Sequence, residues 1–253
     1  MTEASPNRTR HATAPASDLL RGLDVALDGK VPRLVAVFVG LALGWWLYVP
    51  THELLHVAGC VVTGGAVERL DLDPMYGAAL LAQVFPFVHS GSAYAGRLSG
   101  FDTRGNDWIY LATDLAPYLL ALFPGFWGLR RAARRGSALL FGASLPFAFA
   151  PWLSLTGDAY EIGSLAVVQL SPWEPLRGIL LGDDVFLRYR ALAEIAGPAP
   201  WGGFALAIAL GVAWALATTT LASWLAARLG EPPLEPSAAP ARKPRAEGVA
   251  DAV

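Results

Sequence analysis

The chain has 253 residues, of which 54% are hydrophobic and only 16% are charged. A soluble domain of this size needs more charge to cover its surface, so the composition predicts a membrane protein. The net charge of −2 and the lack of a basic stripe with interleaved aromatic residues argue against a nucleic-acid partner. The single cysteine, Cys60, excludes an internal disulfide framework.

Residues 1–30 are polar, contain Arg8, Arg10 and Arg21, and have no apolar stretch that could serve as a signal peptide. We expect a disordered segment that ends in a short helix, which Ser17 could cap, lying on the membrane surface or in solvent. The first apolar segment is therefore expected to stay in the membrane as an anchor.

That first span covers residues 34–64 and is interrupted only by Pro50 and one polar cluster. It is longer than a bilayer needs, which a kink at Pro50 or an extension past the interface would absorb. The Gly64-Gly65 pair should end it, and the imperfect apolar alternation that follows predicts a small β-hairpin-like insertion over 65–105.

Further apolar stretches predict spans at 107–128, 137–155 and 202–227, with a short helix at 157–170 and an irregular loop at 171–200. The fold class expected is an all-α polytopic membrane protein with four to five membrane helices, one of them re-entrant if 157–170 only dips into the bilayer. Three parts follow, namely an N-terminal segment (1–30), a membrane domain (31–229) and a disordered tail (230–253).

Positive residues indicate the orientation. The cluster of four arginines at 130–135 should be cytoplasmic, and so should Lys30, Arg33 and Arg228. This places both termini in the cytoplasm if 157–170 does not cross. The abundance of Ala, Gly, Pro and Arg is typical of GC-rich bacterial genomes, so a multi-pass protein of a bacterial inner membrane is expected.

The chemistry is indicated by the sequence HELLH, which runs from His52 to His56 inside the first span. Residues four apart lie on one helix face, so both imidazoles can bind one ion, while Glu53 can act as a base toward the metal's water. Zinc lowers the pKa of that water toward neutrality. Ionisable groups at membrane depth are costly and usually functional, although two histidines satisfied by hydrogen bonds in a helical bundle are the structural alternative.

In this motif, in the Gly64-Gly65 break with its hairpin-like segment, and in the later intramembrane carboxylates, the chain resembles the site-2-protease-like membrane metallopeptidases. The resemblance covers about residues 34–170. It implies a Zn²⁺ ion held by two histidines and a later aspartate, and a membrane protein or peptide as substrate. The family's Leu-Asp-Gly or Asn-Pro-Asp-Gly element is absent after the histidines, where the family has it. The one Leu-Asp-Gly in the chain, Leu27-Asp28-Gly29, precedes them, so a divergent branch is implied.

Two aspartates compete for the third ligand position, since a catalytic zinc normally has three protein ligands. Asp158 stands in Thr156-Gly157-Asp158 at the start of a short helix, where it could also be a simple cap. Asp114 lies within the second span, three residues before Pro117, and with it resembles the family's Asn-x-x-Pro element, so a substrate or supporting role is also open. We expect Asp158, with Asp114 as the alternative.

Three other residues are given lesser roles. Glu161 lies one turn after Asp158 and is expected to support the site. His89 is expected to be an exposed loop residue. Cys60 is two helical turns from His52, about 12 Å at 1.5 Å per residue, and is expected to be a small buried apolar residue.

The sequence therefore predicts a membrane-embedded zinc metalloendopeptidase in contact with the lipid bilayer. Its expected ligands are His52, His56 and Asp158 (or Asp114), with Glu53 as general base. The alternative is a non-catalytic metal-binding membrane protein or pseudo-protease scaffold, which would not need Glu53.

Overall fold

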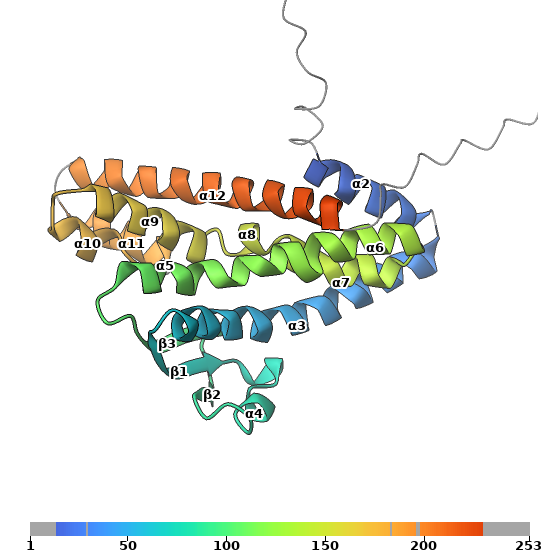
Figure 1. Ribbon diagram of the computed structural model, residues 1–253, viewed down its shortest axis with the longest axis horizontal. Helices are drawn as coiled ribbons and strands as arrows, with labels where there is room; N and C mark the ends of the chain where they lie inside the picture. Colours follow the sequence, from blue (N-terminus) through green and yellow to red (C-terminus); the bar gives the residue numbers. More distant parts are fainter. Residues whose placement is uncertain (1–13, 29, 183, 196–197, 230–253) are drawn as a thin grey trace, which may run out of the picture.

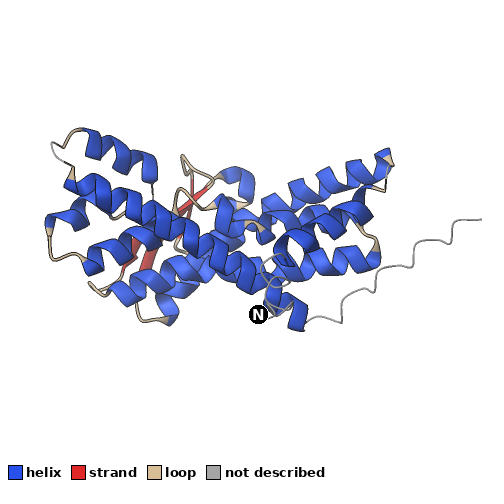
Figure 2. Cartoon of the chain, turned by 90° about the horizontal axis from the view of Figure 1, so that it is seen from above, coloured by secondary structure: helices blue, strands red, loops and turns tan. Residues whose placement is uncertain are grey.

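The computed structural model describes residues 14–28, 30–182, 184–195 and 198–229, and consists of helices with one small sheet (Figures 1 and 2). The elements in chain order are α2 (Ala14–Leu27), α3 (Val31–Val62), β1 (Ala66–Leu72), η1 (Pro74–Tyr76), α4 (Ala78–Leu81), β2 (Val88–Ser90), β3 (Gly96–Asp102), α5 (Asp107–Leu115), η2 (Ala116–Tyr118), η3 (Ala121–Phe126), α6 (Trp127–Arg135), α7 (Ala138–Ala148), α8 (Ala150–Leu153), α9 (Asp158–Leu170), α10 (Pro175–Leu180), α11 (Val185–Ala193) and α12 (Ala199–Leu229).

Three described helical segments are long and apolar enough to cross a membrane, namely Val31–Val62, Asp107–Arg135 and Pro200–Leu229. This is fewer than the four to five expected, because the stretch 137–155 is not one helix. It breaks at Phe149 into α7, with 11 residues, and α8, with four. Figure 1 shows α7, α8 and α9 following one another along the molecule's long axis.

Contacts between helix backbones hold α3 against α7. Gly40 and Gly44 of α3 and Gly142 of α7 lie where a side chain would meet the other helix's main chain. A Cβ atom on Gly142 would lie 2.0 Å from the carbonyl oxygen of Val37. Small residues allow this kind of approach in membrane proteins, where association depends on packing rather than on the hydrophobic effect.

The pair formed by α9 and α12 is packed in the same way. A Cβ atom on Gly163 would lie 2.1 Å from the carbonyl oxygen of Ala207, and one on Gly211 would lie 2.5 Å from that of Ala159. Because Ala159 is the second residue of α9, this contact fixes the start of that helix against α12.

The insertion after α3 is a three-stranded sheet in the order β2-β1-β3, not the hairpin expected from the sequence. Strand β1 pairs antiparallel with β3 and parallel with the short β2. Within the expected hairpin-like insertion, the apolar stretch 78–88 begins as a single helical turn and reaches the sheet only at Val88. Leu70 and Leu72 of β1 are fully buried in the apolar cluster that includes Tyr48 of α3.

The region 171–200, expected to be an irregular loop, contains α10 and α11. Leu176, Leu180 and Leu192 are buried in a cluster with Phe204 of α12. The hydroxyl of Tyr160 on α9 donates a hydrogen bond of 2.9 Å to the carbonyl of Leu180. The apolar residues of this segment are spaced too irregularly to predict helices from the sequence. Their burial against α9 and α12 nevertheless holds the segment in place.

Helix α2 packs against α6, α7 and α12, whereas it was expected to lie on the membrane surface or in solvent. The buried carboxylate of Asp18 accepts hydrogen bonds from Arg130 of α6, at 2.6 Å, and from Ser223 of α12, at 2.8 Å. The expected disorder of the two chain ends lies largely outside the described residues, because positions 1–13 and 230–253 are not among them.

We predict that Gly142→Ala lowers the free energy of unfolding of the detergent-solubilised protein by about 1–3 kcal/mol, and with it the melting temperature, because the new methyl group must push α7 away from Val37. Gly202→Ala on α12 is the matched control, since no atom lies within 4 Å of its Cβ position. Equal thermal shifts for the two variants would contradict this packing.

Candidate metal centre

Helix α3 places His52 and His56 one turn apart on its buried face. Their exposed fractions are 8% and 7%. The two rings meet edge to face, with centroids 4.9 Å apart, and their Nε2 atoms are 3.2 Å apart. The four-residue spacing thus brings two potential ligand atoms to one point, despite Pro50 within the same continuous helix.

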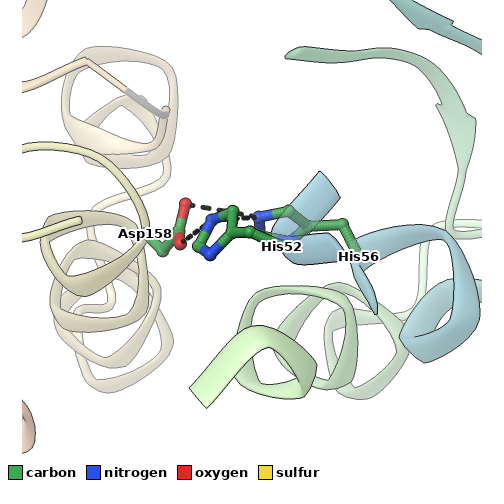
Figure 3. Close-up of side chains that lie close together, drawn as sticks. All are labelled: His52, His56 and Asp158. Atoms are coloured by element: carbon green, nitrogen blue, oxygen red, sulfur yellow. Dashed lines mark hydrogen bonds and ion pairs between the residues drawn. The ribbon is translucent and has the colours of Figure 1, made fainter. Parts of the chain in front are cut away.

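Asp158, the first residue of α9, completes the cluster (Figure 3). One of its carboxylate oxygens lies 3.1 Å from Nε2 of His52, and the other lies 3.5 Å from Nε2 of His56. The donor atoms of these three residues all lie within 4.8 Å of one another, so the group could hold a metal ion.

The spacing fits a small tetrahedral ion. With metal–ligand bonds of about 2.0–2.1 Å and tetrahedral angles, ligand atoms lie about 3.3 Å from one another. The separations of 3.1, 3.2 and 3.5 Å surround this value. Three protein ligands would leave a fourth position for water or substrate, which is typical of catalytic rather than structural zinc.

A backbone carbonyl determines which nitrogen of His56 can bind metal. Its Nδ1 lies 2.9 Å from the carbonyl oxygen of Thr113 on α5. A carbonyl only accepts hydrogen bonds, so Nδ1 must carry the proton, and Nε2 of the neutral ring keeps its lone pair. This orientation of a histidine through its second nitrogen is the usual arrangement in metal sites.

His52 is oriented by Tyr48, which lies one turn earlier on α3. The Tyr48 hydroxyl is 3.1 Å from Nδ1 of His52, and the tyrosine is only 5% exposed. Its ring packs edge-on against Phe147 of α7 at a centroid distance of 5.8 Å. Since the hydroxyl oxygen can accept a hydrogen bond from the Nδ1–H group, Nε2 of His52 can face Asp158.

Glu53 lines the same cavity as His56 and Asp158, which has a volume of about 590 Å³. Its side chain lies directly against Gly96, the first residue of β3, where a Cβ atom would be 2.4 Å from Cγ of Glu53. Strand β3 therefore approaches the carboxylate with main chain alone. The cavity's other walls come from α5, α9 and the residues flanking the start of α11.

The two candidates for the third ligand occupy different places. Asp158 belongs to the metal-binding group, whereas Asp114 does not. Asp114 is 4% exposed and lies on α5, next to the Thr113 carbonyl that orients His56. It lines the same cavity as Asp158, and so does Glu161.

The remaining sequence candidates lie outside the ligand group. Glu161 accepts a hydrogen bond from the hydroxyl of Tyr110 and lines the cavity. His89 is exposed on β2. Cys60 is fully buried under the turn at Gly65, where a Cβ atom would lie 2.5 Å from its sulfur.

Three contributors were not indicated by the sequence analysis. Tyr48 could have been found, because it precedes His52 by four residues on the same helix face. Tyr110 could also have been found, as it lies one turn before Asp114. The Thr113 contact uses a backbone carbonyl, for which no residue pattern exists.

Comparisons with known proteins identify no relative. The chain matches no known family model, no curated protein and no solved structure. What the geometry itself supports is a buried site with two imidazoles, one carboxylate and an adjacent second carboxylate, opening into a cavity.

We predict that Asp158→Asn weakens zinc binding by more than about 10-fold, because an amide oxygen replaces an anionic ligand. Asp114→Asn, which changes a carboxylate of the same cavity, should leave stoichiometric zinc in the purified protein. Metal analysis after dialysis against a weak chelator makes the comparison, and loss of zinc from Asp114→Asn alone would reverse the assignment.

We also predict that Tyr48→Phe weakens zinc binding on the order of 10-fold, since His52 loses the partner of its Nδ1. Tyr94→Phe is the control, because Tyr94 lines a cavity together with Tyr48 and His52 but is 52% exposed. Zinc competition with a fluorescent chelator gives the affinities. An unchanged Tyr48→Phe affinity would show that the hydroxyl does not orient the ring.

Proposed function

We propose that this protein is a membrane-embedded zinc metalloendopeptidase that hydrolyses peptide bonds of membrane-associated substrates. One observation carries the proposal: the ligand atoms of His52, His56 and Asp158 lie within 4.8 Å of one another, and Glu53 lines a cavity together with His56 and Asp158. The three apolar helices support a membrane location. The HELLH motif and its resemblance to site-2-protease-like enzymes support the reaction class.

Each residue has a separable role. His52, His56 and Asp158 hold the ion, and a bound zinc would supply Lewis acidity and a water of lowered pKa. Glu53 follows His52 directly and cannot share its helix face, so its carboxylate is placed to accept the water's proton rather than to bind metal. The same carboxyl group can then pass that proton to the departing amine.

The cavity favours a substrate in an extended form. A helix hides its carbonyl groups in its own hydrogen bonds, so a helical substrate must unwind locally before hydrolysis. A volume of about 590 Å³ accommodates a short peptide stretch, not a packed helix. Arg97, Ser99 and Asp184 at the cavity wall supply polar contacts for such a backbone.

A non-catalytic metal-binding scaffold would need the three ligands but not the base. The close fit of Glu53 against Gly96 favours the enzyme, because it holds the carboxylate in the cavity beside His56. A pseudo-protease would have no use for a carboxylate at this point.

We predict that Glu53→Gln keeps stoichiometric zinc while its cleavage of a reconstituted membrane peptide falls by about 10²–10⁴-fold, since only the base is lost. Glu68→Gln, at an exposed position on β1, should retain both properties. Cleavage is followed by mass spectrometry of the products.

Wild-type protein should also lose activity on treatment with a strong chelator and regain it with zinc. Equal behaviour of wild type and Glu53→Gln, whether both cleave or neither does, would refute the proposed function. The non-catalytic metal-binding scaffold would then remain as the alternative.

A further inference from the structure

A second cavity adjoins the one that Glu53 lines together with His56. Its volume is about 420 Å³, and ligand pockets typically measure roughly 300–1,000 Å³. The residues that line both cavities are Glu53, Tyr94, Gly96, Asp158 and Asp184. Because the proposed base and one proposed ligand are among them, the two cavities meet at the candidate metal centre.

The two cavities extend to different sides of the histidine pair. His56 lines only the first cavity, and His52 lines only the second. On α3 the lining residues run from Trp45 to His56, which is about 17 Å at about 1.5 Å per residue. An extended peptide advances about 3.3 Å per residue, so about five substrate residues would reach from one cavity into the other.

The walls of the two cavities differ in chemistry. The charged residues that line only the first cavity are Arg97, Asp114 and Glu161. The second cavity has apolar walls of its own, formed by Trp45, Val49, Leu153 and Phe186. Among the described residues, none that lines the second cavity alone is an aspartate, glutamate, lysine or arginine. The second cavity is therefore suited to an uncharged, apolar group.

Hydrogen bonds hold two of these apolar walls in place. The indole N–H of Trp45 donates to the hydroxyl of Tyr76 at 2.9 Å. Phe186 lies in the first turn of α11, where its main-chain N–H donates to the carboxylate of Asp184 at 2.8 Å. Both side chains nevertheless remain partly uncovered, with exposed fractions of 37% for Trp45 and 65% for Phe186. Exposed apolar surface within a cavity beside a polar centre is typical of a ligand-binding groove.

We propose that the second cavity is the subsite for a large apolar side chain, such as that of phenylalanine or leucine, on a substrate residue beside the scissile bond. A peptide bond at the metal centre has its neighbouring residues next to this cavity, so such a side chain can leave water and pack against Trp45 and Phe186. Alanine would leave the cavity unfilled. The apolar walls stand on the structure, and their role toward a substrate rests on the proposed function.

Binding of two hydroxamates to the zinc-loaded protein tests the subsite without requiring cleavage. A hydroxamate group chelates zinc at the position left open by the protein ligands, so the amino-acid side chain next to it lies beside the metal. N-acetylphenylalanine hydroxamate should bind about 10–100-fold more tightly than N-acetylalanine hydroxamate, because only the first compound buries a large apolar group. Isothermal titration calorimetry in detergent gives the two affinities.

Two variants connect this affinity ratio to the cavity walls. Phe186→Ala removes a wall and should lower the ratio by about 3–10-fold, while Leu153→Trp fills the cavity and should bring the ratio to about 1 or below. Both positions are exposed, at 65% and 45%, so the fold does not depend on either side chain. Trp108→Ala is the control, since Trp108 is an aromatic residue with 77% exposure that lines neither cavity, and it should leave the ratio unchanged.

Equal affinities of the two hydroxamates, binding of neither, or a ratio that both cavity variants leave unchanged would overturn the subsite. Cleavage gives a second measurement, because Glu53-dependent cuts in a membrane peptide should lie beside large apolar residues. Cuts beside alanine at an equal rate would likewise overturn the subsite while leaving the proposed function intact. If the affinity ratio behaves as expected but no Glu53-dependent cleavage occurs, the proposed function is refuted and the apolar binding site remains.

Discussion

The contact between the Asp158 carboxylate and the imidazoles of His52 and His56 joins α3 of one helix pair to α9 of another. Helix α3 is held to α7 and α9 is held to α12, in both cases by glycines that bring backbones together. The site lies where the first pair meets the second, so its geometry depends on both contacts. Three donor atoms with lone pairs within 3.5 Å of one another repel unless a cation or a proton lies between them. An ion at this point would therefore stabilise the whole arrangement as well as supply its chemistry.

The irregular parts of the chain surround that same point. The break between α7 and α9 and the sheet after α3 contain backbone that is not helical, which a lipid environment tolerates only where it lies against protein or lines a polar cavity. Here it does both. Ser154 and Gly157 precede Asp158 and line the second cavity, which His52 also lines, while β3 approaches Glu53. The break in the expected span 137–155 thus has a physical reason. One continuous helix over 137–170 could not have Asp158 as the first residue of a new helix.

How far the sequence predicts this arrangement depends on the range of each interaction. The spacing of His52 and His56 is local, so their convergence follows from helix periodicity, and the start of a helix at Asp158 was also expected. The pairing of β1 with β2 joins residues separated by a helical turn and loop, and no local pattern indicates a parallel strand of three residues. Helices α10 and α11 depend on burial of Leu176, Leu180 and Leu192 against α12, which is a tertiary effect. The choice between Asp158 and Asp114 likewise needed the relative placement of α5 and α9.

The central claim is a zinc ion bound by two imidazoles and one carboxylate, and X-ray absorption spectroscopy of the purified protein tests it most directly. We predict one zinc per chain, with only nitrogen and oxygen neighbours at about 2.0–2.2 Å and outer-shell scattering from two imidazole rings. A sulfur neighbour at about 2.3 Å would mean that Cys60 is a ligand and that the site described here is not the metal site. Protein that is fully folded yet binds no zinc would contradict the account altogether.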